Sequence, residues 1–438
     1  MSRFLLISGD GDGLGVAMRL KEEGHAVRVQ IRNKKARADY DGLLDKTTEF
    51  ERVLTPDTIV LFDSTGGGKT AERLRSQGHF VFGASMFADQ LELDRELALG
   101  LMEEAGILVP PSQHFVSWQD GIAYVRERPE RYCFKSDKNK LTSYVASSPE
   151  DMMEFLQKQE KEGETAQFEL QDFVKGLEIS TEGWFDGQSF ARPFNHTFEK
   201  KKLMNDDIGP SSGCVGNIVE ACPMCRIVEE GILRFEGILR YHGYVGCIDL
   251  NTICNEEGVW GLEWTPRLGY DAFPALMEML TVPLADIVTR YARGGSGGDF
   301  PMNTTGYGAA LRVSIPPYPC EDVDAPRDVA IRGLIRADRP HAYFYNVYLD
   351  PDGQLRSSGA WGATVAFTGF GETIPDAMGR CEEMAKRVEL RDKQYRTDLI
   401  GEFIEAHAKY KAYIQPQLPE PVAMAQAVQE AVAGTTAG

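Results

Sequence analysis

Two acidic residues on neighbouring predicted strands are the best-placed candidates for chemistry in this sequence. Asp249 lies in the apolar run 244–253 and Glu263 in the run 259–264, and the turn sequence 255–258 separates the two runs. This pattern predicts an antiparallel hairpin that sets the two carboxylates side by side on one face. The apolar neighbours indicate buried strands, and buried acids need a partner. We therefore favour a Mg²⁺ site completed by substrate phosphates over acids that only face water.

Three other motifs that often bind ligands are incomplete. The glycines at 9, 11, 13 and 15 follow a predicted strand but lack the GxGxxG spacing of dinucleotide sites, and a tight turn explains them equally well. The stretch Gly66–Thr70 looks like a P-loop, but the first glycine of that motif would fall at Asp63. Cys222 and Cys225 form a lone CxxC without a second pair of zinc ligands, which favours thiols that bind no metal.

The composition excludes several classes of protein. The 438 residues suit more than one domain at roughly 100–200 residues each, and a net charge of −19 disfavours nucleic acid and anionic membranes as partners. The eight cysteines are too few for a disulfide scaffold. No uncharged apolar run reaches the roughly 18 residues of a membrane span, and the run after Met1 is too short for a signal peptide. We expect a cytoplasmic enzyme or binding protein, a monomer or a homodimer, that acts on small molecules.

The elements that must position these residues alternate between strand and helix over the first 110 residues. Alternation of this kind favours a parallel α/β sheet. Gly106 and the pair Pro110-Pro111 mark the end of the last helix in this block. The predicted strands are 4–8, 26–31, 58–62 and 80–82, and the predicted helices are 16–23 and 89–105.

A smaller block follows, in which short strands surround one helix. Ser147 and Ser148 precede the helix 149–161 as capping residues, and acids occupy its first turn. This arrangement predicts a small α+β lid. Its strands are predicted at 132–135, 144–146, 168–173 and 179–185.

The remainder of the chain is a mixed region with two flexible segments. A loop rich in Lys, Asp, Ser and Gly at 200–216 precedes a predicted helix near 227–241, and the glycines at 294–298 predict a linker. The Ala-, Gln- and Pro-rich end predicts disorder. We expect an N-terminal α/β substrate domain at 1–112, a lid at 113–186, a core with the metal hairpin at 187–300, a C-terminal domain at 301–415 and a disordered tail at 416–438.

At the hairpin the sequence resembles the ATP-grasp superfamily, whose members hold ATP between a small lid and a core. The segments Cys247–Leu250 and Leu262–Arg267 match the signature of its metal-binding strands, except that Thr265 replaces the usual Asn. Further motifs are similar to glycinamide ribonucleotide synthetase (phosphoribosylamine–glycine ligase), in the same order from residue 1 to about 405. They are Phe82–Ser85, Gln90–Glu92, Phe134–Asp137, Asp172–Glu178, Asp207–Gly216, Thr368–Thr373 and Tyr395–Gly401.

The resemblance implies a fold and an activity. The fold is α/β, an ATP-grasp fold with an N-terminal parallel α/β domain, a small α+β lid and a C-terminal mixed α/β domain. The activity is a ligation that depends on ATP and on Mg²⁺ or Mn²⁺: a carboxylate attacks ATP to give an acyl phosphate, and an amine then displaces phosphate. Its specific form joins glycine to phosphoribosylamine in purine biosynthesis, and another amino acid or amine is almost as well supported. A catalytically weak nucleotide-binding paralogue, acting as a sensor or subunit, is the alternative.

The resemblance also implies roles for individual residues. Each role is a contact with ATP, with the metal or with the reacting carbonyl. Asp249, Glu263 and Thr265 would hold the metal, Lys135 and Arg95 would contact the ATP phosphates, Gln171, Asp172 and Val174 would form the adenine hinge, Glu178 would bind the ribose hydroxyls, Lys201 would contact phosphate or the acyl intermediate, and Arg267 would stabilise the oxyanion. For each basic residue taken alone, a surface charge is the ordinary alternative.

The departures from the family pattern lie mostly on the substrate side. A phosphate in a water-poor pocket needs cations or several N–H donors, and Asp10 and Asp12 add negative charge instead. We therefore expect phosphoribosylamine to be a poor substrate, unless Arg312 and Arg356 turn inward. The altered stretches are 14–16, 138–142, 269–272, 316–319 and 362–364.

Overall fold

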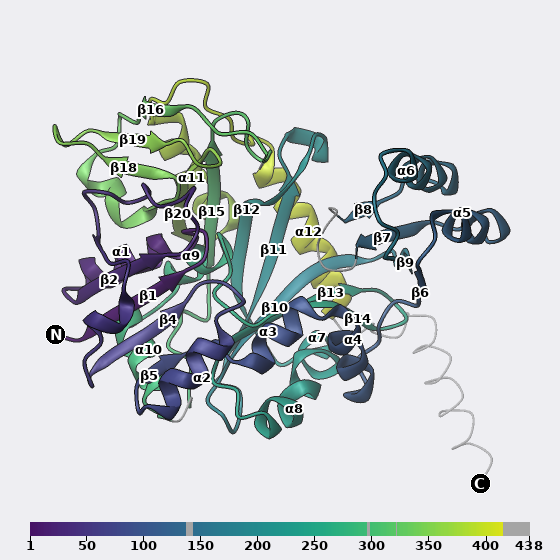
Figure 1. Cartoon of the computed structure of the whole chain (residues 1–438), viewed down its shortest axis with the longest axis horizontal. Coiled ribbons are helices and arrows are strands. Elements are labelled where there is room, and N and C mark those ends of the chain that lie inside the picture. The colour runs from purple at the N-terminus through teal and green to yellow at the C-terminus, as the bar shows by residue number, and fades with distance from the viewer. Residues whose placement is uncertain (137–142, 296–297, 321, 415–438) are drawn as a thin grey trace, which may run out of the picture.

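The computed structural model describes residues 1–136, 143–295, 298–320 and 322–414. A large antiparallel sheet runs through the centre of the molecule, a parallel sheet lies beside it, and a small module projects to one side (Figure 1). The predicted lid loop 138–142, residues 296–297 of the predicted linker and the predicted disordered tail 416–438 lie outside the described residues.

The N-terminal sheet is parallel, as the alternation of strands and helices predicts, with strand order β3-β2-β1-β4-β5. Its central strands are apolar along their length because both faces are covered, and every residue of β4 is buried. The strands are β1 (Arg3–Ser8), β2 (Ala26–Ile31), β3 (Asp45–Lys46), β4 (Thr58–Phe62) and β5 (Phe80–Phe82), and the helices are α1 (Leu14–Glu22), the short η1 (Phe50–Val53) and α2 (Gly68–Ser76).

The single helix predicted at 89–105 is two helices. Helix α3 (Met86–Leu93) ends before Asp94, and α4 (Arg95–Glu104) begins directly after it. Asp94 leaves the helical conformation, and its side chain accepts a hydrogen bond from the backbone N–H of Leu97. Aspartate is a preferred N-cap residue, so the break starts a new helix at the residue expected to contact phosphate.

The lid is a four-stranded sheet, in the order β6-β9-β7-β8, with two helices on its outer side (Figure 1). It has its own hydrophobic core, in which the Trp118 and Phe168 rings stack with centroids 4.7 Å apart over Leu156. Ser148 caps the second helix, as the sequence predicts. The elements are β6 (Ser112–Phe115), α5 (Trp118–Glu127), β7 (Tyr132–Ser136), β8 (Tyr144–Val145), α6 (Pro149–Lys161) and β9 (Phe168–Asp172).

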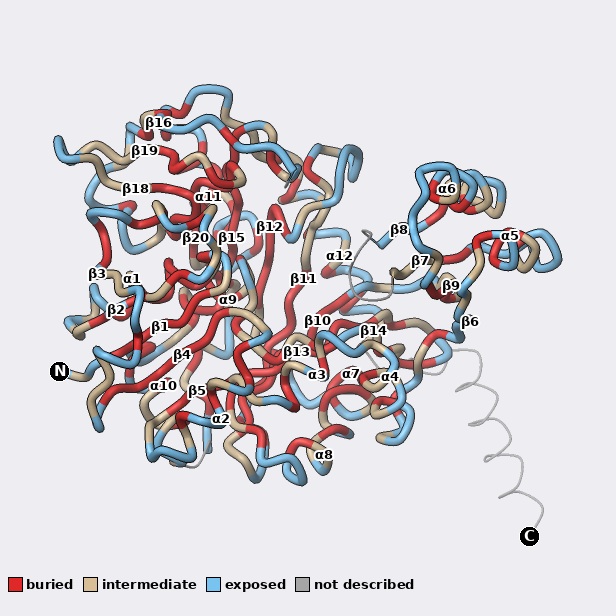
Figure 2. Tube along the Cα trace, in the orientation of Figure 1, coloured by how far each residue is buried: buried red, intermediate tan, exposed pale blue. Residues whose placement is uncertain are grey.

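The central sheet has eight antiparallel strands in the order β14-β13-β10-β11-β12-β15-β20-β17. Its buried residues continue into the N-terminal sheet, so the two share one hydrophobic core (Figure 2). The strands are β10 (Leu177–Phe185), β11 (Phe194–Lys202), β12 (Ser211–Cys222), β13 (Gly246–Cys254), β14 (Val259–Thr265), β15 (Tyr307–Ser314), β17 (Ala342–Phe344) and β20 (Ala363–Gly371).

One strand joins a different sheet from the one that the sequence suggests. The run 179–185, assigned to the lid from its place in the chain, is β10, and it pairs with β13 along nine residues and with β11 on its other side. Its apolar side chains are therefore buried in the central sheet. Strands β15 and β20, in the predicted C-terminal block, extend the same sheet beyond β12. The domain boundaries themselves stay a prediction.

Helices cover the central sheet, and residues of the C-terminal part of the chain form a separate three-stranded sheet. The helix predicted at 227–241 is interrupted at Gly231, whose backbone is not helical and lies against the carbonyl of Ile227. The helices are η3 (Asn205–Asp207), α7 (Arg226–Glu230), η4 (Ile232–Phe235), α8 (Glu236–Tyr241), α9 (Ala272–Met277), α10 (Leu284–Ala292), η5 (Arg336–His341), α11 (Ile374–Arg387) and α12 (Leu399–Ile414), and the small sheet contains β16 (Arg327–Ala330), β18 (Val347–Leu349) and β19 (Leu355–Ser358). Among the described residues, no helix is long and apolar enough to cross a membrane.

Candidate active site

One face of the central sheet gathers acidic side chains from four neighbouring strands. In the hairpin, Asp249 pairs with Thr265, and Asn251 pairs with Glu263. Directly paired residues share a face, and so do residues two apart in one strand. The two predicted metal ligands therefore lie on one face, as expected, but as diagonal neighbours rather than opposite one another. Glu182 of β10 pairs with Asp249 on its other side.

Burial raises the pKa values of three acids on this face, Asp249, Glu182 and Glu199. The pKa of Asp249 lies well above its usual range because of burial, with further contributions from Glu182 and Glu199. Burial raises the pKa of Glu182 to about 7, although the indole N–H of Trp184 donates to its carboxylate at 2.9 Å. Crowded carboxylates that resist ionisation in this way are stabilised by a cation.

The donor set on this face suits a magnesium ion. The side-chain oxygen of Asn251 is buried and has no hydrogen-bond partner among the described residues. Asn251 also lowers the pKa of the neighbouring Glu178 carboxylate. No cluster of three or more His, Cys, Asp or Glu side chains in the described part of the chain could hold a metal alone. Two carboxylates and an amide oxygen suit Mg²⁺, which retains water molecules and takes substrate phosphates as its other ligands.

Cations from the lid and from α4 face Glu263 across a cleft of about 380 Å³. Lys135 of β7, Arg95, His114 and Glu263 all line this cleft. Burial lowers the pKa of Lys135, Glu263 raises it, and Arg95 lowers it further, so these charges act on one another. Arg95 is held by Glu169, at 3.4 Å, and by the carbonyl of Leu262, at 3.2 Å. The structure thus brings the two predicted phosphate-binding cations to the predicted metal ligand.

Lys201 lies on the same face as the acids, on β11. Its ammonium group is 2.9 Å from the Glu178 carboxylate and 3.8 Å from that of Glu199. Burial lowers the pKa of Lys201, but Glu178, Glu199 and Glu263 together raise it above its usual value. Burial alone would raise the pKa of Glu178, but Lys201 outweighs this effect and the pKa lies below its usual value. Lys201 therefore stays charged and links Glu178, the predicted ribose ligand, to the acidic face of the sheet.

The predicted adenine hinge lies where β9 leaves the lid. The Gln171 side-chain nitrogen is buried without a partner among the described residues, and the Asp172 N–H donates to the Pro111 carbonyl at 2.8 Å. Val174 follows outside any strand, and its N–H and C=O make no hydrogen bond to the described backbone. An unpaired backbone donor and acceptor at this point can pair with the edge of a base.

Arg267 lies just beyond β14, on the side away from the lid. Its guanidinium is 2.8 Å from the Glu92 carboxylate and lies over the Tyr270 ring, 4.5 Å from the centroid. Burial lowers its pKa, but Tyr270, Glu92 and Asp12 raise the value above its usual range. Burial raises the pKa of Glu92. Arg267 is thus a fixed, permanently charged group at the end of the hairpin.

The two glycine-rich stretches are held by acids of the protein itself. The Ser8 hydroxyl and the N–H groups of Gly9 and Gly13 all donate to the buried Asp63 carboxylate. In the P-loop-like stretch, the N–H groups of Gly66 and Gly68 both donate to Asp89 at 2.8 Å. These backbone donors, which would face phosphate in a nucleotide loop, are already satisfied.

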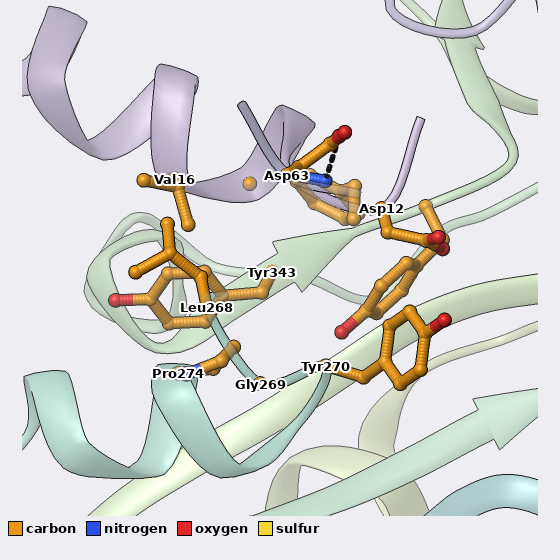
Figure 3. A pocket seen from close by; sticks show the side chains of 12 residues that line it. Asp12, Val16, Asp63, Leu268, Gly269, Tyr270, Pro274 and Tyr343 are labelled. Carbon is orange, nitrogen blue, oxygen red and sulfur yellow. Dashed lines mark hydrogen bonds between the residues drawn. The ribbon is translucent and has the colours of Figure 1, made fainter. Parts of the chain in front are cut away.

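A pocket next to Arg267 is lined by residues of two of the five altered stretches, 14–16 and 269–272 (Figure 3). Asp12 and Val16 enter it from the N-terminal loop and α1, Tyr270 from the segment after β14, and Tyr343 from β17. Arg312 is held by Asp271, to which its guanidinium makes two bonds of 2.7 and 2.9 Å. Arg356, the other cation considered from the sequence, forms an ion pair of 2.5 Å with Asp350.

Sequence reasoning missed three members of the acidic face, namely Glu182, Glu199 and Asn251. A signal was present for the first, because Glu178, Ser180 and Glu182 recur at every second position and so share one face of a strand. The positions of the other two depend on strand pairing across the central sheet, which no local pattern specifies.

Comparisons of sequence and of structure both find a likeness to phosphoribosylamine–glycine ligases. No family model matches the sequence. The chain is 23% identical to the phosphoribosylamine–glycine ligase of Ralstonia nicotianae, over 74% of this chain and 79% of the relative. It is 24% identical to that of Corynebacterium ammoniagenes, over 84% and 88%. The crystal structure of phosphoribosylamine–glycine ligase from Thermotoga maritima superposes with a TM-score of 0.69 at 20% identity, over 90% of this chain and 99% of that one.

The solved structure of a different enzyme has a similar fold. The N5-carboxyaminoimidazole ribonucleotide synthetase of Thermotoga maritima superposes with a TM-score of 0.57 at 14% identity, over 89% of this chain and 99% of that one. The protein therefore has the ATP-grasp fold that its motifs implied. Within this fold, its sequence and structure resemble those of phosphoribosylamine–glycine ligase.

Proposed function

We propose that the protein is an ATP- and Mg²⁺-dependent carboxylate–amine ligase that works through an acyl phosphate. The observation that carries this proposal is a single cleft in which Lys135 and Arg95 face Glu263, with Asp249 on the same sheet face. Cations that can bind phosphate thus lie on one side of the cleft, and an acid that can bind a metal ion lies on the other. Catalysis of phosphoryl transfer is mainly positioning and charge neutralisation, which such a cleft supplies.

The nucleotide would lie between the lid and the central sheet. The free backbone groups of Val174 would pair with the adenine edge beside Gln171 and Asp172, and Glu178 would accept the ribose hydroxyls. Lys135 and Arg95 would neutralise phosphate oxygens, since charge-assisted bonds to phosphate are the strong ones. Each of these roles matches what the family resemblance implies.

The metal would be held by Asp249, Glu263 and the amide oxygen of Asn251. Mg²⁺, or Mn²⁺ in its place, supplies charge neutralisation between adjacent phosphates. Thr265 shares the face and pairs with Asp249, but its hydroxyl is a weaker neutral donor than an amide. Asn251 would thereby provide the amide ligand that the hairpin lacks at Thr265.

The second half of the reaction would take place at Arg267. This guanidinium, fixed by Glu92, would stabilise the negative charge that develops on the carbonyl oxygen as the amine attacks. Lys201 would hold the departing phosphate or the acyl group. The substrates would be glycine or another amino acid and a small amine, acting in purine biosynthesis or a related amide synthesis in the cytoplasm.

The test separates a ligase from a nucleotide-binding sensor. The protein is incubated with ATP, Mg²⁺, a panel of amino acids and hydroxylamine, which traps acyl phosphates as hydroxamates whatever the natural amine is. We expect ADP and hydroxamate in equal amounts with at least one amino acid. Binding of ATP without ADP formation in every mixture would establish the sensor instead.

A matched pair of variants tests the role of the metal face. Glu263→Gln should reduce hydroxamate formation at least about 100-fold, because a neutral amide cannot balance the metal charge. Glu256→Gln, at the exposed turn of the same hairpin, should retain full activity. Equal activity of the two variants, both with unchanged thermal unfolding, would contradict the metal assignment.

A further inference from the structure

The pocket beside Arg267 contains one acid without a partner. Asp12 lines the pocket, and among the described residues no group donates a hydrogen bond to its carboxylate. Figure 3 shows its side chain next to Tyr270, opposite Val16 and Tyr343. Asp12 is half-buried, and a ligand with a donor group would give its carboxylate the hydrogen-bond partner that the protein does not supply.

The cations near this pocket are already occupied by other acids. Arg267 is bound by Glu92, and Arg312 is bound through two bonds by Asp271. Each guanidinium also lies over a tyrosine ring, Arg267 over Tyr270 and Arg312 over Tyr345. Each guanidinium is thus paired with a carboxylate of its own, and although both also lower the pKa of Asp12, burial and Asp63 outweigh them.

The backbone donors of the loop are occupied as well. The N–H groups of Gly9 and Gly13 donate to Asp63, and that of Gly11 donates to the Ser8 hydroxyl. A phosphate in this pocket would therefore meet the Asp12 carboxylate and three N–H groups that point elsewhere. Repulsion of this kind disfavours an anion and favours a cation.

We propose that this pocket binds a non-phosphorylated primary amine as its ammonium ion, with Asp12 holding the ammonium group and accepting its proton. The proposal rests on the ligase function proposed above and names the class of amine. The pocket adjoins the segment Leu268–Tyr270 that follows Arg267, so the amine would lie next to the residue that stabilises the oxyanion.

The reaction balances with the groups present. The ammonium ion transfers one proton to the Asp12 carboxylate, which becomes a carboxylic acid, and the neutral amine gains a free electron pair. That pair attacks the acyl carbon and forms the C–N bond, while the C–O bond to phosphate breaks and phosphate leaves with its electrons. The second proton leaves with the phosphate. Burial and the nearby Asp63 raise the pKa of Asp12 to about 7, which suits a group that exchanges protons at neutral pH.

The experiment compares amines on the unmodified protein. With the amino acid that yields hydroxamate, ADP release is measured with phosphoribosylamine and with ethanolamine, 1,3-diaminopropane and tyramine. We expect at least one non-phosphorylated amine to exceed phosphoribosylamine about tenfold or more in kcat/KM. Phosphoribosylamine as the best substrate, or no acceptance of any amine, would overturn the ammonium pocket. Absence of hydroxamate with every amino acid would overturn the ligase function and this inference with it.

A pair of neighbouring variants tests Asp12 itself. Asp12→Asn should lower the ratio of amine ligation to hydroxamate formation about tenfold, since the amide cannot take a proton. Asp10→Asn is the matched control, because Asp10 is exposed and bonded to Asn33 outside the pocket, and this variant should keep the parent ratio. An unchanged ratio in a folded Asp12→Asn protein would overturn the role of Asp12.

Discussion

At the scale of single residues, the site is defined by which polar atoms have no partner. The Asn251 oxygen is buried and unbonded among the described residues, and the same side chain lowers the pKa of Glu178. A buried carbonyl oxygen left without a donor costs free energy. Its position on the acidic face suggests that a metal ion, rather than a protein group, satisfies it.

The Asn251 side chain should therefore matter for metal-dependent nucleotide binding. Asn251→Ala should weaken Mg²⁺-dependent ADP binding by roughly tenfold, a loss typical of a group that supports a metal site. Isothermal titration with and without Mg²⁺ measures the effect, and adding Thr265→Asn to this variant should restore most of the affinity. Equal losses in the presence and absence of Mg²⁺ would show that Asn251 acts through Glu178 alone.

Lys135 should contribute to ATP affinity through charge. Lys135→Ala should weaken ATP binding roughly tenfold or more, because a charge-assisted hydrogen bond contributes about 1.5–3 kcal/mol. Lys158→Ala is the control, since Lys158 lies exposed on α6 of the same lid. Both dissociation constants follow from titration with ATP. An affinity equal to that of the control variant would remove Lys135 from the phosphate site.

At the scale of elements, local sequence patterns predicted whether a segment is a helix or a strand. They did not predict which strands pair with one another. The hairpin, the helix at 149–161 and the N-terminal strands follow from apolar spacing, turns and caps, and the structure confirms them. The register between Asp249 and Glu263 depends on an irregularity after Asn251, which no residue pattern announces. Strand β10 has a sequence that fits either sheet, and only long-range packing decides between them.

The loop after β2 is anchored to the C-terminal part of the chain by a buried acid. Asp39 accepts a hydrogen bond from Asn346 at 3.0 Å, and the neighbouring Tyr40 hydroxyl donates to the Phe344 carbonyl. Burial raises the pKa of Asp39 to about 7, although Ser358, Asn346 and Lys46 lower it. The folded protein therefore binds this proton more tightly than the unfolded chain does, in which the pKa is about 3.9.

The pH dependence of this anchor has a definite sign. Because the folded pKa is the higher one, Asp39 makes the free energy of unfolding fall as pH rises from about 4 to 7, by up to about 1.4 kcal/mol per pH unit. Asp39→Asn removes the titration, so the variant should gain stability relative to the parent over this range. Urea unfolding at pH 5 and pH 7 measures the difference, and parallel changes in both proteins would contradict the assignment.

At the scale of the whole molecule, the lid has a core of its own and lies over the proposed nucleotide cleft. Its aromatic core is distinct from the core shared by the other sheets, whereas Lys135 and Glu169 from the lid line the cleft together with Arg95 and Glu263. A ligand between the two bodies binds both at once, so it should hold the lid in place.

Nucleotide should therefore protect the lid selectively. Saturation with ADP and Mg²⁺ should slow amide hydrogen exchange in β7 and β9, because the bound phosphates link the lid to the central sheet. Exchange in the N-terminal strands β1 and β4 is the internal control and should not change, since they lie in a different core. Uniform slowing across the chain, or none in the lid, would argue against closure over nucleotide.

The path of the chain into and out of the lid has a consequence for how such a protein can diversify. The chain enters through β6 and leaves through β9, with Ser112 paired to Gln171 and the Asp172 N–H bonded to the Pro111 carbonyl. The two crossing points are thus adjacent, and a two- or three-residue turn would span them. A gene that gains, loses or exchanges this insert leaves the ends of the remaining backbone where they were. The lid can therefore change in sequence or be exchanged without moving the pocket beside Arg267, whose lining residues all lie outside it.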